Sequence, residues 1–418
     1  MHKKHNIIDL LLARGFIYQC TNLRVLHHLC QKQISAYIGF DCTAPSLHIG
    51  SLVQIMALRL LQRCGHIPII IIGRGTTKVG DPSGKDKMRK MLTESTITQN
   101  FTRIKSTLKK LLLWTVPNKP IILDNNTWLK NLNYLNFLRN FGQYFAIKKM
   151  ISYDCVRTRL KRTQSLSFLE FNYMLLQAFD FYQLSRHYKC ILQIGGSDQW
   201  SNIINGVDFI KKTSDQIVYG LTTPLLTTKN GDKMGKTVDG AIWLSKDLLS
   251  NYKYWQFWRN VNDINVMKYL YLFTELPEKN IQKYTACTGQ KLNDTKKMLA
   301  NEITKICHGH APALQAYMTS IAIFNTQTTY ICIAYFRINA DDFKKKITLF
   351  QLITDSKLAK TNSISKKVIN NKTIKINDKI IDNPFLIITT SLFCDQIMKV
   401  SIGKKKYILF KLTKNKNL

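Results

Sequence analysis

The sequence has few acidic residues. Among its 418 residues, 26 Asp and Glu stand against 61 Lys and Arg, which gives a formal net charge of +35. An excess of this size predicts a polyanionic partner or an anionic surface. A coding bias would give the same excess without any partner, because the chain is rich in Lys, Asn and Ile throughout. The charge alone therefore does not decide between these interpretations.

The sequence also lacks the cysteine patterns of a metal site or a disulfide framework. Its ten cysteines form no CxxC pair and no Cys/His cluster with zinc spacing, which predicts reduced, mostly structural thiols. No apolar run approaches the roughly 20 residues that a membrane span needs. The first residues have neither the long apolar region of a signal peptide nor the Arg and Ser content of a transit peptide. We therefore expect a cytoplasmic protein with no membrane partner and no protein-bound metal.

The fingerprints of two common nucleotide-binding loops are missing as well. The segment GDKMGKT, residues 231–237, ends like a P-loop, but the P-loop pattern needs a glycine where Asn230 stands, and no buried strand precedes it. The segments GRGTTK and GGSDQW likewise fail the dinucleotide-binding fingerprint. What remains at residues 231–237 is a polar loop with Lys233 and Lys236, which is suited to closing over phosphates.

Apolar strands alternate with helical stretches in the first half of the chain, which predicts an α/β domain with a parallel sheet over residues 1–228. The strand patterns then fade, and we expect a smaller α-helical domain over residues 229–325. Residues 326–345 are irregular and are expected to form a linker. Residues 346–418 have short alternating runs and basic clusters, which predicts a small separate module.

Polar segments follow the predicted strands. Ligands bind at the carboxyl ends of the strands of a parallel sheet, and four segments lie at such ends: 39–51, 73–89, 171–181 and 193–200. In the first of them, His48 stands where an apolar-periodic helix begins. The free N–H groups of a helix N-terminus attract anions. His48 therefore either serves a bound anion or only caps the helix.

Two motifs of the sequence resemble a known pair. His48-Ile49-Gly50 at a helix start, followed by Lys-Met-Gly-Lys-Thr at residues 233–237, is similar to the HIGH and KMSKS signatures of class I aminoacyl-tRNA synthetases. The segments YIGFDCTAPSLHIG, GDPSGK, FLEFNYMLLQAFDF and QIGGSDQW occur in the order found in bacterial-type tyrosyl-tRNA synthetases. The resemblance begins near residue 8, is dense to about residue 259, and is weakest in the tail.

The resemblance implies a fold and an activity. The fold would be a Rossmann-like catalytic domain, a small α-helical domain and a C-terminal αL-type RNA-binding module. The activity would be the activation of L-tyrosine by ATP, with Mg²⁺, to tyrosyl-adenylate and pyrophosphate, followed by transfer of tyrosine to the 3′ end of tRNA(Tyr). The resemblance also implies a homodimer, with Phe168 at the interface.

The resemblance further implies three sets of site residues. Those expected to assist the chemistry are Thr43, His48, Ser51, Lys85, Arg89, Lys233, Lys236 and Thr237. Those expected to bind tyrosine are Tyr37, Asp81, Tyr173, Gln177, Asp180 and Gln199. Those expected to bind ATP are Gly39, Asp41, Thr43, His48, Gly50, Gly195, Gly196, Asp198 and Lys236.

Tyr37 and Asp180 match the pair that selects the phenolic hydroxyl of the substrate. Asp180 lies between Phe179 and Phe181, where a carboxylate needs a partner. The incoming phenol is the partner that we expect.

Some residues depart from the family pattern. Ser51 stands where the motif commonly has a second histidine, and Ile38 where a cysteine is frequent. Arg74 replaces a glycine in a strand-end turn, where a long cation could crowd the site. In the tail, Asn370 and Asn371 replace the usual glycines.

Two other functions stay open on these residues. A former synthetase retained only to bind RNA would explain Arg74 and the divergent tail. A small-molecule ligase or nucleotidyltransferase would share the fold but would have no use for the basic tail. The lysines at 344–346 and 404–406 suit RNA binding, although they would also suit a solvated surface.

Overall fold

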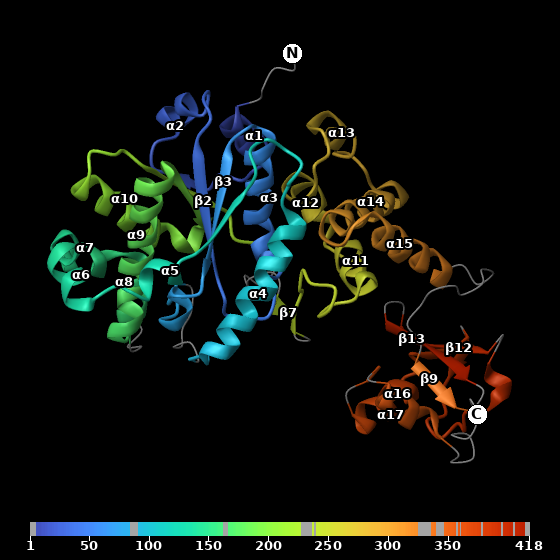
Figure 1. Ribbon diagram of the computed structural model, residues 1–418. Helices are drawn as coiled ribbons and strands as arrows, with labels where there is room; N and C mark the ends of the chain where they lie inside the picture. Colours follow the sequence, from blue (N-terminus) through green and yellow to red (C-terminus); the bar gives the residue numbers. More distant parts are fainter. Residues whose placement is uncertain are drawn as a thin grey trace. The chain divides into compact units, whose positions relative to one another are not determined.

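The chain folds into two compact units, residues 1–317 and 318–418 (Figure 1). The computed structural model describes residues 6–83, 91–161, 166–226, 236–237, 240–324, 336–339, 347–356, 358–359, 361–377, 379–393, 396–403 and 406–413. No helix in these ranges is both long and apolar enough to cross a membrane.

The first unit is built on a six-stranded sheet with the order β1-β6-β5-β2-β3-β4. Five of the strands are parallel, and the short edge strand β1 is antiparallel to β6. The strands are β1 (Gln19–Cys20), β2 (Ser35–Asp41), β3 (Ile67–Gly73), β4 (Ile121–Asp124), β5 (Cys190–Gly196) and β6 (Tyr219–Thr223). The expected α/β architecture with a parallel sheet is confirmed.

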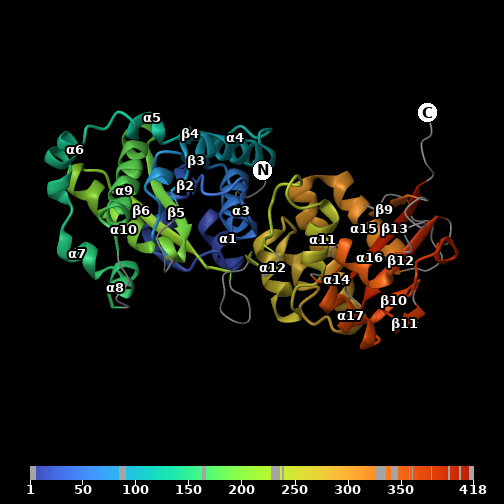
Figure 2. The ribbon, with the colours of Figure 1, turned by 90° about the horizontal axis from the view of Figure 1, so that it is seen from below.

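Helices cover both faces of this sheet (Figure 2). Alternate residues of a strand point to opposite faces, so Ala36, Ile38 and Phe40 of β2 enter one core while Tyr37 enters the other. The first core contains α1 (Ile7–Ala13), α3 (Ile49–Arg63) and α4 (Glu94–Leu111), and the second contains α9 (Phe168–Tyr188) and α10 (Trp200–Thr213). The remaining helices around the sheet are α2 (Leu23–Leu29), α5 (Asn126–Leu129), α6 (Tyr134–Asn140), α7 (Ile147–Ser152) and α8 (Asp154–Lys161).

The helical segment after the sheet belongs to the same compact unit. It begins with a two-stranded hairpin, β7 (Lys236–Thr237) and β8 (Gly240–Ala241). The helices are α11 (Asn251–Arg259), α12 (Val266–Phe273), α13 (Glu278–Gln282) and α14 (Gly289–His308), followed by α15 (His310–Phe324), within which the first unit ends.

Arginines from two helices of the sheet layer fix this helical segment. Arg14, directly after α1, donates to the carbonyls of Tyr271 and Thr274 at 3.0 and 2.7 Å. Arg59 of α3 forms an ion pair with Glu275 at 2.8 Å. The helices therefore pack firmly against the sheet layer, and residue 228, the predicted domain boundary, does not separate two compact units.

The second unit has its own five-stranded sheet, with the order β11-β10-β12-β13-β9. Its elements are β9 (Phe336–Asn339), α16 (Leu349–Asp355), α17 (Asn362–Asn370), β10 (Ile374–Ile376), β11 (Lys379–Ile381), β12 (Ile397–Ile402) and β13 (Lys406–Thr413). Apolar residues of both helices and of the sheet share one core.

Strand β9 corrects the predicted linker at residues 326–345. It pairs in parallel with β13, and Ile338 is buried in the core of the second unit. The backbone pairing makes β9 part of the sheet, and the buried side chain belongs to the same core. The second unit therefore does not begin at residue 346.

Candidate active site

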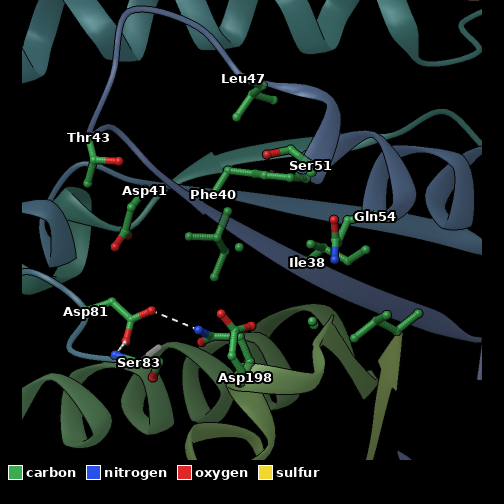
Figure 3. A pocket seen from close by; sticks show the side chains of 18 of the residues that line it. Ile38, Phe40, Asp41, Thr43, Leu47, Ser51, Gln54, Asp81, Ser83 and Asp198 are labelled. Atoms are coloured by element: carbon green, nitrogen blue, oxygen red, sulfur yellow. Dashed lines mark hydrogen bonds between the residues drawn. The ribbon is translucent and has the colours of Figure 1, made fainter. Parts of the chain in front are cut away.

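A pocket of about 480 Å³ opens at the carboxyl ends of β2, β3 and β5. β2 lies between β3 and β5, so the chain leaves β2 in one direction toward β3 and later returns on its other side. A crevice forms at such a reversal of strand order. Figure 3 shows Thr43 and Ser51 above this pocket and Asp81, Ser83 and Asp198 below it.

Most of the predicted site residues meet in this pocket. The lining includes Tyr37, Gly39, Asp41, Thr43, His48, Gly50, Ser51, Asp81, Tyr173, Gln177, Asp180, Gly195, Gly196, Asp198 and Gln199. Lys85, Arg89 and Lys233 lie outside the described residues. Of Lys236 and Thr237 the structure describes the backbone only, as strand β7.

His48 caps helix α3 and also lines the pocket. Its Nδ1 accepts a hydrogen bond from the backbone N–H of Gly50 at 3.0 Å. A ring nitrogen that accepts carries no proton, so in the neutral imidazole the proton sits on Nε2. Capping thus gives the ring a donor that could serve an anion, and the two interpretations of His48 are compatible.

Asp81 belongs to a closed polar network. Its Oδ1 accepts from the backbone N–H of Ser83 at 2.9 Å, and its Oδ2 accepts from the amide of Gln199 at 2.8 Å. Asn202 closes the ring, donating to Gln199 at 3.1 Å and to the hydroxyl of Ser83 at 3.3 Å. Sequence reasoning missed Ser83 and Asn202, because single Ser and Asn residues give no spacing signal.

Asp41, at the end of β2, holds two further groups of the pocket. It accepts hydrogen bonds from the hydroxyls of Thr76 at 2.8 Å and of Tyr173 at 3.0 Å. Gly73 permits this arrangement, because a Cβ there would overlap with Asp41 and Thr76. Tyr173 was expected to bind the ammonium group of tyrosine, and in this structure its hydroxyl is oriented by a carboxylate.

Asp180 is buried in α9 and already has two protein partners. Its oxygens accept from the side-chain amide of Asn125 at 2.9 Å and from the indole N–H of Trp128 at 2.7 Å. Burial raises the pKa of Asp180 to about 7, and these two hydrogen bonds oppose the shift. We expected the substrate phenol to be the partner of an otherwise unpaired carboxylate. That expectation is wrong in this respect, because two residues after β4 supply donors that the sequence around Asp180 does not reveal.

Three buried polar atoms on residues that line the same pocket as Asp180 have no hydrogen-bond partner in the described part of the chain. They are the hydroxyl of Tyr37 and the side-chain oxygens of Gln177 and Gln193. All three residues line the pocket. Because an unpaired buried polar group costs free energy, this part of the pocket is chemically suited to a polar ligand. Gln193 was not among the predicted residues, since it lies within a strand rather than at its end.

Arg74 does not crowd the pocket. Its Nε lies 3.2 Å from Asp124, and its guanidinium group lies over the ring of Phe101, 5.5 Å from the centroid. The residues that line the pocket do not include it. The ion pair and the aromatic face thus keep this cation away from the site.

The segment after β8 pairs with the start of α3 through backbone hydrogen bonds. Ile49 donates its N–H to the carbonyl of Ile242 at 3.0 Å, and Leu244 donates to the carbonyl of Leu47 at 2.9 Å. Trp243, which forms an antiparallel bridge with His48, lines the pocket. Backbone pairing therefore places residues 242–244, a few positions after the second motif, next to the first motif.

Comparisons with known proteins agree with this geometry. The family model of the class I tRNA synthetases (W and Y) matches residues 29–325. A tyrosine–tRNA ligase of Pelagibacter ubique is 49% identical over 401 residues, covering 96% of this chain and 97% of that protein. One of Rickettsia typhi is 47% identical over 408 residues, covering 97% and 99%. A C-terminally truncated mitochondrial tyrosyl-tRNA synthetase of Aspergillus nidulans matches with a TM-score of 0.70 and 31% identity, covering 77% of this chain and 95% of that chain.

The chain belongs to the class I tRNA synthetases of the tryptophan and tyrosine type. Within that class it is of the bacterial tyrosyl-tRNA synthetase type, with tyrosine–tRNA ligase activity. Its fold is the Rossmann-like α/β fold of the class. ATP is a substrate of this reaction.

Proposed function

We propose that the pocket holds tyrosine beside Asp180 and ATP at the carboxyl ends of the strands, and that tyrosyl-adenylate forms between them. The observation that carries this proposal is the group of three unpaired buried atoms, on Tyr37, Gln177 and Gln193, that line one pocket with Asp180. A phenol that accepts from Tyr37 would satisfy one of these three atoms, and it would donate to Asp180 as a third partner of that carboxylate.

The polar network around Asp81 suits the other end of tyrosine. The carboxylate of Asp81 would accept from the ammonium group together with Tyr173 and Gln177, and Gln199 would orient the carboxylate of the substrate. Because Gln199 already donates to Asp81 at 2.8 Å, the two side chains are positioned before the substrate enters. This placement leaves the carboxylate of tyrosine toward the mouth of the pocket.

ATP would bind where backbone approaches the pocket closely. Gly195 and Gly196 end β5, and a Cβ on Gly196 would lie 2.8 Å from the carboxylate of Asp198 and displace it, so glycine lets Asp198 keep the position from which it would hold the ribose. Thr43 and His48 would donate to the phosphates at the N-terminus of α3, which attracts anions. Gly39, Asp41, Gly50 and Ser51 complete this part of the lining.

The reaction would be an in-line attack by the carboxylate of tyrosine on the α-phosphate of ATP. An oxygen–phosphorus bond forms, the bond to the bridging oxygen of the β-phosphate breaks, and pyrophosphate leaves. Such a transfer requires positioning and neutralisation of charge rather than covalent help from the protein. We assign contact with the departing pyrophosphate to Lys85, Arg89, Lys233, Lys236 and Thr237. Mg²⁺ would enter with ATP, since it usually binds through substrate phosphates.

The test is tyrosine-dependent exchange of labelled pyrophosphate into ATP by the purified full-length protein. We expect exchange with tyrosine and much less with phenylalanine. Absence of exchange, together with retained binding of tRNA(Tyr), would contradict the proposed chemistry and favour a protein that only binds RNA.

We further propose that the second unit is an αL-type RNA-binding module. In support, α16 and α17 pack on a five-stranded sheet around a core of their own, and exposed lysines lie on both helix and strand, including Lys367 and Lys379. Lysines of this kind would neutralise phosphates of the tRNA.

We also propose a homodimer with Phe168 at its interface. Phe168 begins α9 with 69% of its surface exposed, and Leu160 of the neighbouring α8 is half exposed. A buried ion pair between Arg159 and Glu170, at 2.9 Å, holds α8 beside the start of α9. Exposed apolar residues held in a fixed arrangement are typical of an interface. The cytoplasmic localisation stays a prediction.

A further inference from the structure

His308, the last residue of α14, contacts the segment 242–244, which follows β8 and pairs with the start of α3. Its Nε2 lies 3.1 Å from the backbone carbonyl of Leu244. A carbonyl oxygen only accepts, so Nε2 carries the proton and donates this bond. Nδ1 is buried and has no partner in the described part of the chain. Burial lowers the pKa of His308, so the neutral ring with its proton on Nε2 is the stable form.

The ring of His308 is held in place by its neighbours. It packs on the ring of Tyr254 with a centroid distance of 4.6 Å. The hydroxyl of the fully buried Tyr254 bonds in turn to the sulfur of Cys307 at 3.2 Å. A left-handed Gly309, with φ of 100°, ends the helix directly after the histidine. Packing against Tyr254 therefore fixes the ring from which His308 donates to Leu244.

The acceptor of His308 is tied to the active site from its other side. The N–H of Leu244 donates to Leu47 at 2.9 Å, and two residues earlier the carbonyl of Ile242 accepts from Ile49 at 3.0 Å. The segment 242–244 is thus held between α14 and the start of α3. It continues directly from β8, whose partner strand β7 contains Lys236.

We propose that His308 is a positioning residue for adenylate formation: by holding the carbonyl of Leu244, it keeps the β7–β8 hairpin in register with the helix start that carries His48. The inference rests on the proposed chemistry of the pocket. Neither His308 nor Leu244 lines the pocket that contains Asp180, so loss of their contact should slow the chemical step and leave tyrosine binding unchanged. A small misplacement of a reacting group lowers the rate by up to about 100-fold.

The experiment compares three substitutions of His308 in the full-length protein. His308→Leu removes the donor, His308→Gln keeps an amide N–H near the position of Nε2, and His308→Asn carries an amide that is too short to reach. Tyr254→Phe is the matched control, because it removes a hydrogen bond from the same cluster without touching Leu244. For each variant we would measure kcat and KM for ATP in pyrophosphate exchange, Kd for tyrosine without ATP, and Tm.

We expect His308→Leu and His308→Asn to lower kcat about 10- to 100-fold with an unchanged Kd for tyrosine, and His308→Gln to recover most of the rate. Tyr254→Phe should lower Tm without a comparable loss of kcat. Equal rates in the Gln, Asn and Leu variants, or rates that only follow Tm across all four variants, would overturn the proposal. Absence of exchange in the unmodified protein would instead contradict the proposed function itself.

Discussion

Trp128 donates its indole N–H to Asp180 over 2.7 Å, and Asn125 donates to the other oxygen over 2.9 Å. Both donors follow β4, so one segment far from Asp180 in the sequence orients the carboxylate before any substrate enters. The carboxylate is buried, and its pKa is raised to about 7 by that burial. A substrate hydroxyl that adds a third donor would favour the ionised form of Asp180.

Replacing Tyr37 by Phe should lower the selectivity for tyrosine over phenylalanine several-fold. The hydroxyl of Tyr37 is buried without a partner in the described residues, and one neutral hydrogen bond to a phenol is worth about 0.5–1.5 kcal/mol. The measurement is the ratio of kcat/KM for the two amino acids in pyrophosphate exchange. Tm serves as the control, since the loss of an unpaired hydroxyl should not lower it. An unchanged ratio would mean that Tyr37 only packs against Phe181.

The affinity for tyrosine should rise with pH through about 7 and then level off. The pKa of Asp180 in the free protein is about 7, and a bound phenol lowers it by favouring the charged form. Below this pKa the site must therefore release a proton on binding, and the affinity falls as the pH falls. Trp128→Phe removes a donor to the carboxylate and should move the rise to higher pH. Equilibrium dialysis with phenylalanine as the comparison would check this, and parallel curves for the two amino acids would count against it.

Lys236→Ala should slow adenylate formation strongly while leaving the Kd for tyrosine without ATP nearly unchanged. The charge of Lys236 would serve a leaving group that develops only in the transition state. Single-turnover rates and equilibrium dialysis separate the two effects. Lys246→Ala is the control, because this exposed lysine follows the same segment. Equal losses in rate and in tyrosine affinity would refute the assignment.

Deleting residues 326–418 should leave pyrophosphate exchange intact and abolish most tRNA charging. The deletion starts before β9, because β9 belongs to the sheet of the second unit. The affinity of the full chain for tRNA should also fall steeply with salt, as lysine–phosphate contacts require. If the shortened protein charges tRNA as well as the full chain does, the second unit has no role in binding tRNA.

Phe168→Asp should convert the protein to a monomer at micromolar concentration. A charge in place of an exposed apolar side chain would disfavour burial in an interface. Sedimentation velocity measures the assembly, and Ile264→Asp is the control, since Ile264 is 81% exposed in the helical segment. A monomeric unmodified protein, or dimers in both variants, would contradict the proposed interface.

Elements with local causes can be predicted from the order of the residues. The apolar period after His48 predicts α3, which begins at Ile49 and is capped by His48. The apolar strands that alternate with helices predict the parallel sheet, and motifs at strand ends predict residues that do meet in one pocket, such as Asp41 and Gly195. These features follow from chain periodicity and from the rule that parallel strands end at one edge.

The side chains that support these residues are identified by the packing of the folded chain. Asn125 and Trp128 at Asp180, and Asn202 beside Gln199, are single residues without a spacing pattern. Likewise, Ile338 shows its place in the second sheet only through the strand that pairs with it. His308 reaches Leu244 across 64 positions of the chain. Contacts of this kind depend on how separate elements pack, and burial of one partner against another is a property of the folded chain that no local pattern encodes.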